Sequence, residues 1–142
     1  LKNGSNLYID YAHTPDALKN VLETLLKIPH RKIISVFGCG GDREKQKRPI
    51  MGNIATCMSD VTVITSDNSR NEKTSDIIAD IVGGVRYKSN FLVIEDRKEA
   101  ILKAISLAEE NDIILLAGKG HENYEIIGNT KRYFSEIPSI IS

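Results

Sequence analysis

Three polar, turn-rich segments constrain the fold of this chain most, because each directly follows a short run of apolar, largely β-branched residues. Such runs are typical of strands that are buried on both faces, as in parallel sheets. Ligands of an open α/β sheet bind beyond the carboxyl ends of its strands, so the three segments are expected to share one rim. The runs and their segments are residues 33–37 with 38–43, 61–65 with 66–71, and 113–117 with 118–122.

Apolar residues at helical spacing lie between these strands, and the elements alternate along the chain. This alternation predicts one α/β domain over residues 1–142, with a Rossmann-like, mostly parallel sheet of about six strands and helices on both faces. A C-terminal hairpin can add an antiparallel edge. The expected strands are 7–10, 32–37, 61–65, 92–94 and 113–117, the expected helices are 15–27, 49–58, 75–82 and 97–108, and the hairpin joins 124–127 to 131–134.

The composition fits a soluble globular domain without a polyanionic partner. Of the 142 residues 41% are hydrophobic, and 19 Lys and Arg balance 19 Asp and Glu. Nucleic acid and anionic membranes favour a basic surplus, so neither is expected as a partner. Cys39 and Cys57 form no disulfide framework, which favours the cytosol, and no apolar run is long enough to span a membrane. Because the chain starts at Leu1 rather than Met, it is expected to be a piece of a longer protein.

The segment at residues 38–43 is rich in glycine and ends on Arg43. It lacks the G-x-x-x-x-G-K-[ST] pattern of a P-loop, and Arg43 stands where a dinucleotide fingerprint needs its third glycine. Two interpretations remain: a tight turn that needs glycine, or an anion site built from backbone N–H groups and Arg43. The charged run at residues 43–48 is expected to be mostly a solvated loop.

Candidate binding residues also follow the first and third expected strands. Asp10 ends a strand, where a carboxylate can accept hydrogen bonds from ribose hydroxyls, and His13 either contacts a phosphate or caps the next helix. Asp67 and Asn68 are good turn formers, so this loop can be an ordinary one. Arg70, however, offers a planar fork for a carboxylate, and Asp67 brings the opposite charge three residues away.

The segment at residues 118–122 combines glycines, which let a backbone approach a ligand closely, with Lys119, His121 and Glu122. Gly120 follows Lys119, which excludes a Walker motif. The His, Cys and acidic residues of the chain show no zinc-ligand spacing, so no metal site is expected.

The shared rim is therefore expected to carry both signs of charge. Desolvated charges need partners, so such a rim suits a small ligand with ammonium and carboxylate groups. An amino acid fits this description better than a bare polyanion. The charged members of the rim are Arg43, Asp67, Arg70, Lys119 and Glu122.

Four motifs together resemble the C-terminal domain of the Mur ligase family. They cover the chain nearly from end to end, and their combination is highly specific. The similarity is closest to the branch that adds the third, diamino acid to UDP-N-acetylmuramoyl-L-alanyl-D-glutamate, the UDP-N-acetylmuramoyl-tripeptide synthetases. The motifs are Tyr-Ile-Asp-Tyr-Ala-His-Thr-Pro at 8–15, Val-Phe-Gly-Cys-Gly-Gly-Asp-Arg at 36–43 with Lys-Arg-Pro at 47–49, Thr-Ser-Asp-Asn-Ser-Arg at 65–70, and Ala-Gly-Lys-Gly-His-Glu at 117–122.

The resemblance implies a cytoplasmic, three-domain ligase of peptidoglycan precursor synthesis, of which this chain matches only the last domain. In that reaction ATP converts the substrate carboxylate to an acyl phosphate, which the amine of the diamino acid attacks. The central domain carries the P-loop, the Mg²⁺ ligands and a carbamylated lysine, so ATP and Mg²⁺ are bound mainly there and the fragment alone is expected to be inactive. The implied partners are UDP-N-acetylmuramoyl-dipeptide, a diamino acid, and the N-terminal and central domains of the same chain.

The resemblance also implies roles for individual residues. It places Asp10 and His13 beside the nucleotide, and it implies no catalytic residue in this domain alone. Lys119 and His121 are additional candidates at the amino-acid site. The residues that it places around the diamino acid are Arg43, Asp67, Asn68, Ser69, Arg70, Gly118 and Glu122.

One departure from the family pattern bears on the substrate. The diaminopimelate signature of the family is Asp-Asn-Pro-Arg, and here Ser69 stands in place of the proline. Arg70 is retained, which favours meso-diaminopimelate with its extra carboxylate, whereas a looser turn keeps L-lysine and L-ornithine open. The alternatives are a Mur ligase that adds a different residue and a non-catalytic nucleotide-binding or regulatory module. The latter leaves the acids and arginines at the strand ends unexplained.

Overall fold

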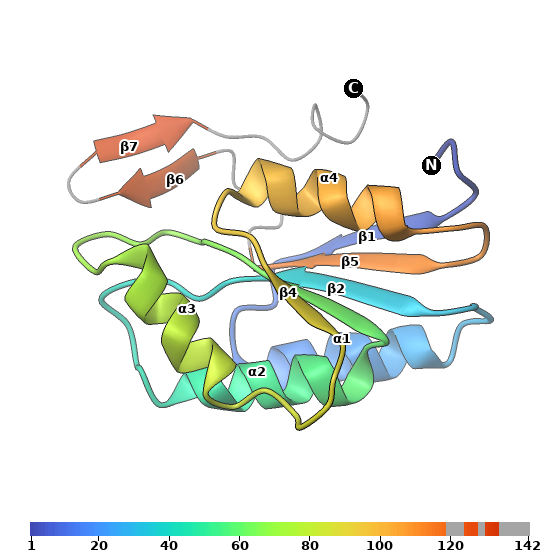
Figure 1. Cartoon of the computed structure of the whole chain (residues 1–142), viewed down its shortest axis with the longest axis horizontal. Coiled ribbons are helices and arrows are strands. Elements are labelled where there is room, and N and C mark those ends of the chain that lie inside the picture. Colours follow the sequence, from blue (N-terminus) through green and yellow to red (C-terminus); the bar gives the residue numbers. More distant parts are fainter. Residues whose placement is uncertain (119–123, 128–129, 134–142) are drawn as a thin grey trace.

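Five short strands of mainly β-branched and aliphatic residues form a parallel sheet (Figure 1). The computed structural model describes residues 1–118, 124–127 and 130–133. Every residue of β2 and β5 in the sheet interior is buried, which explains why these strands lack polar alternation. In spatial order the strands are β1 (Asn6–Asp10), β5 (Ile113–Ala117), β2 (Ile33–Phe37), β3 (Val61–Ile64) and β4 (Phe91–Val93), and all neighbours pair in parallel.

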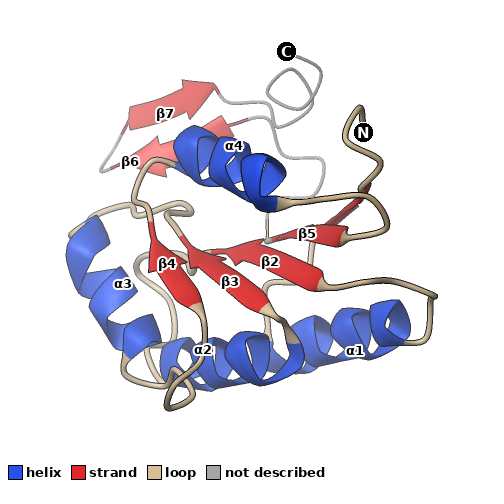
Figure 2. Cartoon of the chain, turned by 45° about the vertical axis from the view of Figure 1, so that its right-hand side comes forward, coloured by secondary structure: helices blue, strands red, loops and turns tan. Residues whose placement is uncertain are grey.

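Helices cover both faces of this sheet, as the alternating pattern predicts (Figures 1 and 2). Side chains alternate across a strand, so Ile33 and Phe37 of β2 pack into the core on one face, and Ile34 and Val36 into the core on the other. None of the helices in the described part of the chain has the length and apolar character that crossing a bilayer requires. The first face carries α1 (Pro15–Leu26), α2 (Lys47–Met58) and α3 (Thr74–Val82), and the second carries α4 (Arg97–Leu107).

Local sequence sets where two of the helices begin. Thr14 Oγ1 accepts a hydrogen bond from Ala17 N at 3.2 Å, and proline occupies the first position of α1. The Asp96 carboxylate accepts from the first turn of α4, as its sequence context predicts. The second helix begins at Lys47, two residues before the predicted start at Pro49. Proline is tolerated in a first turn, where its missing N–H costs no hydrogen bond.

The predicted C-terminal hairpin is present as β6 (Tyr124–Ile127) and β7 (Thr130–Tyr133), which pair antiparallel. It forms a two-stranded sheet of its own, so within the described residues the main sheet has five strands and not about six. In a hairpin, each strand pairs the backbone groups of one edge with the other strand and leaves its second edge open. The hairpin sequence therefore does not indicate whether that second edge joins a larger sheet. The predicted turn at residues 128–129 and the end at residue 134 lie outside the described residues.

The contact between α2 and α3 depends on a glycine and gives a direct test of the fold. A Cβ added at Gly52 would lie 2.2 Å from the backbone oxygen of Ile81, whereas one added at Gly83 would lie no closer than 3.4 Å to its neighbours. We expect Gly52→Ala to lower the free energy of unfolding by about 1–3 kcal/mol through overpacking. Gly83→Ala is the matched control and should change it by less than about 0.5 kcal/mol. Urea denaturation measures both, and equal stability of the two variants would contradict this close packing.

Candidate functional site

The loops after β1, β2, β3 and β5 meet at the carboxyl edge of the sheet and line a pocket of about 330 Å³. This is the rim that parallel strands were expected to create. The predicted site residues come from segments far apart in the sequence, and the structure brings six of them together around the pocket. They are His13, Arg43, Asp67, Asn68, Arg70 and Gly118.

The other predicted residues lie elsewhere or are not described. Asp10 is exposed at the end of β1 beside the pocket, where its Oδ1 accepts a hydrogen bond from Ala12 N at 2.8 Å. Ser69 is buried, and its hydroxyl lies 2.7 Å from Thr74 Oγ1, so it supports the loop and does not line the pocket. The predicted contacts Lys119, His121 and Glu122 lie outside the described residues.

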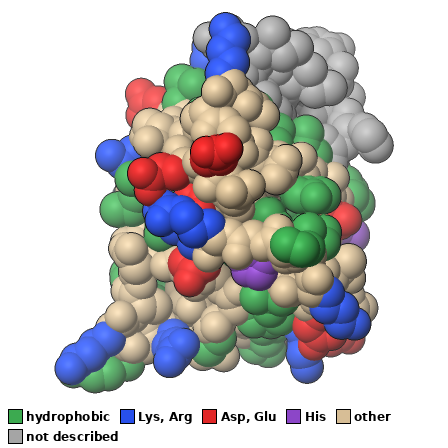
Figure 3. All heavy atoms as spheres, turned by 90° about the vertical axis from the view of Figure 1, so that its right-hand side faces the viewer, with side chains coloured by type: hydrophobic (Ala, Val, Ile, Leu, Met, Phe, Trp, Pro, Cys, Tyr) green, Lys and Arg blue, Asp and Glu red, His purple; other side chains and the backbone are tan. Residues whose placement is uncertain are grey.

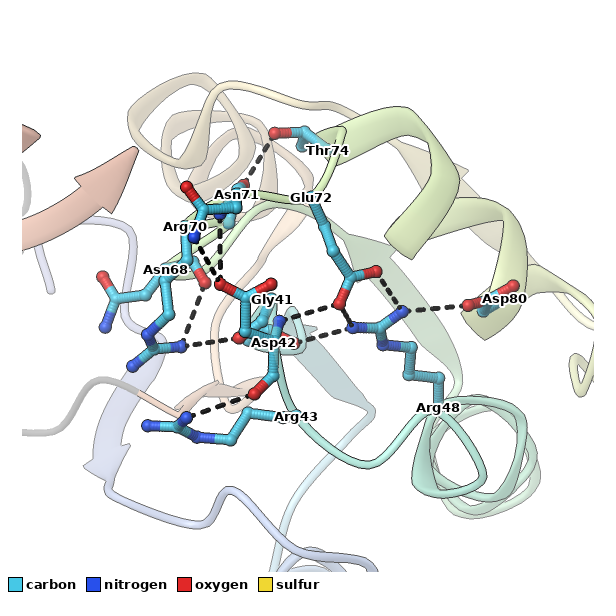
Figure 4. A network of polar contacts seen from close by, with 12 residues as sticks. Gly41, Asp42, Arg43, Arg48, Asn68, Arg70, Asn71, Glu72, Thr74 and Asp80 are labelled. Carbon is cyan, nitrogen blue, oxygen red and sulfur yellow. Dashed lines mark hydrogen bonds and ion pairs between the residues drawn. The ribbon is translucent and has the colours of Figure 1, made fainter. Parts of the chain in front are cut away.

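The loop after β2 and the loop after β3 are locked together by backbone contacts (Figure 4). Gly41 N donates to Asn68 O at 2.6 Å, and Arg70 Nη1 donates to both Gly41 O at 3.0 Å and Asn68 O at 3.2 Å. A Cβ at Gly41 would lie only 1.7 Å from Ser69 O, so only glycine allows the two backbones to come this close. The segment at residues 38–43 is therefore more than a tight turn, because its glycine joins two loops of the pocket.

Arg70 is held in place without the proline of the family signature. Its φ of 52° lies in the left-handed region, which is unfavourable for a residue with a side chain and persists only where the surroundings fix it. The preceding residue, Ser69, is anchored by its hydroxyl contact with Thr74 and by a bond to Asp67 O at 3.3 Å. Hydrogen bonds therefore supply the constraint that the proline ring would otherwise give to this turn.

An ionic network around the buried Arg48, which also lines the pocket, lies next to these loops. Arg48 is only 1% exposed, and its guanidinium binds the Glu72 carboxylate through both Nη atoms, at 2.9 and 2.7 Å. It also donates to Asp80 Oδ2 and Gly40 O, both at 3.0 Å. The hydrogen bonds from Arg48 are the main cause that lowers the pKa of Glu72 from 4.5 to about 2, so this carboxylate is ionised across the physiological range.

The sequence prediction of a mostly solvated run at residues 43–48 misses Arg48. A signal for its burial was nevertheless present, since Arg48 precedes Met51, Gly52 and Ala55 at the spacing of the inner face of α2. Placing the helix start at Pro49 excluded Arg48 from that pattern. Its partner Glu72 lies 24 residues away and could not be assigned from spacing.

Arg97 is a second buried arginine that sequence reasoning did not single out. It is 2% exposed and donates to Ser66 O at 3.3 Å and to Ala117 O at 3.0 Å. These carbonyls immediately precede Asp67 and Gly118, so Arg97 ties together the ends of β3 and β5. A Cβ added at Gly118 would lie 3.4 Å from Asp67 Oδ2, which shows how near the Asp67 carboxylate is to the Gly118 backbone.

The thiol that lines the pocket is not suited to nucleophilic catalysis. It belongs to Cys39, and burial and the charge of Asp67 raise the pKa of this thiol to about 12, so it is protonated and a poor nucleophile. Among residues 1–118, no three His, Cys, Asp or Glu side chains gather in a way that could hold a metal ion. What the pocket offers is a set of charges of both signs. They belong to the cationic side chains of Arg43, Lys47, Arg48 and Arg70 and to the carboxylates of Glu44 and Asp67.

A different ion-pair group lies at the amino ends of β2 and β5 and has a structural role. The buried Asp112 carboxylate accepts from Arg31 Nε at 3.0 Å and from Glu109 N at 2.8 Å. Burial opposes the ionisation of Asp112, but the two hydrogen bonds and the positive charges of Arg31 and Lys32 together outweigh burial and lower its pKa. Figure 3 shows the face at the right of Figure 1, where acidic and basic side chains lie interspersed.

Comparisons with known proteins agree on one family. The family model described as "Mur ligase, glutamate ligase domain" matches residues 1–120. The UDP-N-acetylmuramoyl-L-alanyl-D-glutamate–2,6-diaminopimelate ligase 1 of Clostridium acetobutylicum is 53% identical over 92% of this chain and 27% of its own length, and the ligase of Clostridioides difficile is 52% identical over 94% and 28%. The chain thus spans just over a quarter of these relatives.

Solved structures lead to the same family. A structure of a UDP-N-acetylmuramoyl-L-alanyl-D-glutamate–2,6-diaminopimelate ligase superimposes with a TM-score of 0.92 at 40% identity, over 97% of this chain and 28% of that one. Escherichia coli FolC in complex with ADP superimposes with a TM-score of 0.59 at 16% identity, over 79% of this chain and 25% of that one. The second likeness shows a shared fold only.

The Arg48–Glu72 pair predicts how acid affects stability. Because the pKa of Glu72 is about 2 in the folded chain against 4.5 ordinarily, its contribution is complete above about pH 5 and is lost as the pH falls toward 2. We expect Glu72→Gln to lower the free energy of unfolding by about 2–3 kcal/mol near neutral pH, and the difference from the wild type to shrink toward zero at about pH 2. Urea denaturation at a series of pH values measures this. A difference that does not change with pH would contradict the role of the ionised carboxylate.

Proposed function

The chain belongs to the Mur ligase family, and we propose that it is the C-terminal domain of an ATP-dependent ligase that adds meso-diaminopimelate to UDP-N-acetylmuramoyl-L-alanyl-D-glutamate. The single observation that carries the proposal is the pocket at the carboxyl edge of the sheet, where Arg43, Asp67 and Arg70 from two interlocked loops meet. The similar ligases of Clostridium acetobutylicum and Clostridioides difficile are named for 2,6-diaminopimelate, which supports the choice of diamino acid. Membership of a ligase family also argues against the alternative of a non-catalytic nucleotide-binding or regulatory module.

The charges of the pocket match those of a diamino acid with two carboxylates. Arg43 and Arg70 can each bind a carboxylate through a planar fork, and Asp67 can accept hydrogen bonds from an ammonium group. Two hydrogen bonds to backbone carbonyls orient Arg70 before any ligand arrives. Because Arg70 is already ordered, little conformational entropy is lost at this side chain when the ligand binds. A substrate that lacks one of these charged groups leaves its partner unpaired and should be bound much more weakly.

The contribution of these residues to the reaction is to place the attacking amine. Holding the carboxylates and one ammonium group of the diamino acid fixes the position of its other amino group, which raises the effective concentration of the nucleophile. When bound, ATP supplies the phosphoryl group that activates the carboxylate of the other substrate. We therefore assign to this domain the binding and orientation of the diamino acid, with Asn68, Gly118 and Glu122 as further contacts and Lys119 and His121 as additional candidates.

The residues that we propose to contact the nucleotide lie at the end of β1 and just after it. Asp10 and His13 are exposed there, within reach of a ligand that spans this edge of the sheet. Since the chain has no P-loop, we propose that the central domain binds ATP and Mg²⁺ for the most part, and that Asp10 and His13 contact the nucleotide from this side. The proposed partners are UDP-N-acetylmuramoyl-dipeptide and the N-terminal and central domains of the same chain. The proposed location is the cytoplasm, where ATP is the common phosphoryl donor.

The substrate is tested on the full-length protein with meso-diaminopimelate, L-lysine and L-ornithine. We expect ATP-dependent product with meso-diaminopimelate at a kcat/KM at least about 100-fold above that with either of the others, because each of these leaves a guanidinium without its carboxylate. The isolated 142-residue chain should form no product under the same conditions. Absence of product with all three amino acids would contradict the proposed function.

Arg70 is expected to bind the carboxylate that lysine lacks. We expect Arg70→Ala in the full-length protein to raise the KM for meso-diaminopimelate by about 10- to 100-fold, the value of a charge-assisted pair, and to leave the KM for ATP nearly unchanged. Arg86→Ala is the matched control, because it removes an exposed arginine that lies outside the pocket. Steady-state kinetics decide, and an unchanged KM for meso-diaminopimelate in Arg70→Ala would exclude Arg70 as the group that recognises this carboxylate.

A further inference from the structure

One carboxylate next to the pocket, that of Glu72, connects the two loops that carry Arg43 and Arg70. Glu72 Oε1 accepts from Asp42 N at 2.7 Å, and Asp42 directly precedes Arg43. Glu72 itself follows Arg70 by two residues, so the same side chain belongs to the loop of one arginine and binds the loop of the other (Figure 4). Glu72 does not line the pocket, and nothing in its contacts assigns it to a ligand.

Arg48 completes this connection from the side of α2. Its Nη1 and Nη2 hold the two oxygens of Glu72, and Nη2 also donates to Gly40 O at 3.0 Å. The segment before Arg43 is therefore fixed at two points, at Gly40 by the guanidinium and at Asp42 by the carboxylate. We call Arg48 and Glu72, together with the N–H of Asp42, the loop latch.

The latch holds backbone conformations that are unfavourable on their own. Asp42 and Arg70 have φ values of 54° and 52°, both in the left-handed region. For residues with side chains such conformations persist only where the surrounding contacts over-determine them. A further bond between the loops, from Asn71 Nδ2 to Asp42 Oδ2 at 3.1 Å, is exposed to water and is therefore weaker than the bonds that the latch makes to the buried Arg48 guanidinium.

We propose that Arg48 and Glu72 are positioning residues for the diamino acid, which fix Arg43 and Arg70 relative to each other so that both carboxylates of the ligand are bound at once. This inference rests on the proposed function and deepens it, because it names what sets the spacing of the two cationic groups. Releasing the latch removes the fixed points at Gly40 and Asp42, so that the segment carrying Arg43 can shift, while the Gly41–Asn68 hydrogen bond and the strands beneath the loops stay paired. Affinity for a ligand that must reach both arginines then falls, whereas ATP binding is unaffected.

Asp80 provides a matched control for this idea. Its Oδ2 binds Arg48 Nη1 at 3.0 Å, so Asp80→Ala and Glu72→Ala each remove one carboxylate from the same buried guanidinium. Asp80 lies on α3, however, and within the described part of the chain its side chain makes no hydrogen bond or ion pair to either loop of the pocket. A purely structural role of the ionic network predicts similar effects of the two substitutions, and a positioning role predicts different ones.

The experiment is steady-state kinetics on the full-length protein, with thermal unfolding of each variant as a check on folding. We expect Glu72→Ala to raise the KM for meso-diaminopimelate by about tenfold or more, with the KM for ATP within about twofold of the wild type, and Asp80→Ala to leave both within about twofold. Glu72→Gln keeps one acceptor for Asp42 N, so it should recover part of the loss and give a rise of about threefold.

The outcomes separate the two proposals. A wild-type protein without activity toward meso-diaminopimelate overturns the proposed function and this inference with it. An active wild type with equal KM values in Glu72→Ala and Asp80→Ala overturns the inference alone. If Glu72→Ala does not fold, the milder Glu72→Gln decides, and an unchanged KM for meso-diaminopimelate in that variant overturns the positioning role.

Discussion

Arg48 carries a full positive charge into a place that water does not reach, and the rim of the sheet is arranged around that charge. A buried guanidinium is tolerated only when carboxylates and carbonyls replace its hydration. Glu72, Asp80 and Gly40 O supply that replacement, and they come from three different segments of the chain. The need to satisfy one charge therefore fixes the loop after β2, the loop after β3, the first turn of α2 and the last turn of α3 relative to one another.

Parallel topology explains why this arrangement lies at the pocket and not elsewhere. The strand ends deliver the loops to one edge, and Arg97 then joins the ends of β3 and β5 through the carbonyls of Ser66 and Ala117. Two buried arginines thus hold the backbone of the rim, while Arg43 and Arg70 at the pocket are available for a ligand. Buried cations with many protein partners stabilise the geometry, and more exposed cations with few partners provide recognition.

The sequence was sufficient for the fold and for the expectation that the candidate residues share one rim, but not for what holds that rim together. Buried runs such as 33–37 and 113–117 predict parallel strands from local pattern alone, and parallel strands imply a shared rim. The partnership of Arg48 with Glu72 depends on how loops fold over the sheet, and no periodicity encodes it. The same holds for Ser69, whose role became clear only from its contact with Thr74, and for the hairpin, whose own hydrogen bonds do not specify a neighbour.

The replacement of the signature proline by Ser69 bears on the choice between diamino acids. A proline restricts the turn through its ring, whereas here a buried hydroxyl, the Gly41–Asn68 backbone bond and two carbonyl acceptors for Arg70 impose the restriction. Since Arg70 is oriented by these bonds at the edge of the pocket, the argument that a looser turn would admit lysine or ornithine loses its physical basis. In an enzyme that adds lysine, an oriented guanidinium with no carboxylate to bind would weaken substrate binding. In an enzyme that selects an amino acid with a second carboxylate, the same guanidinium strengthens binding.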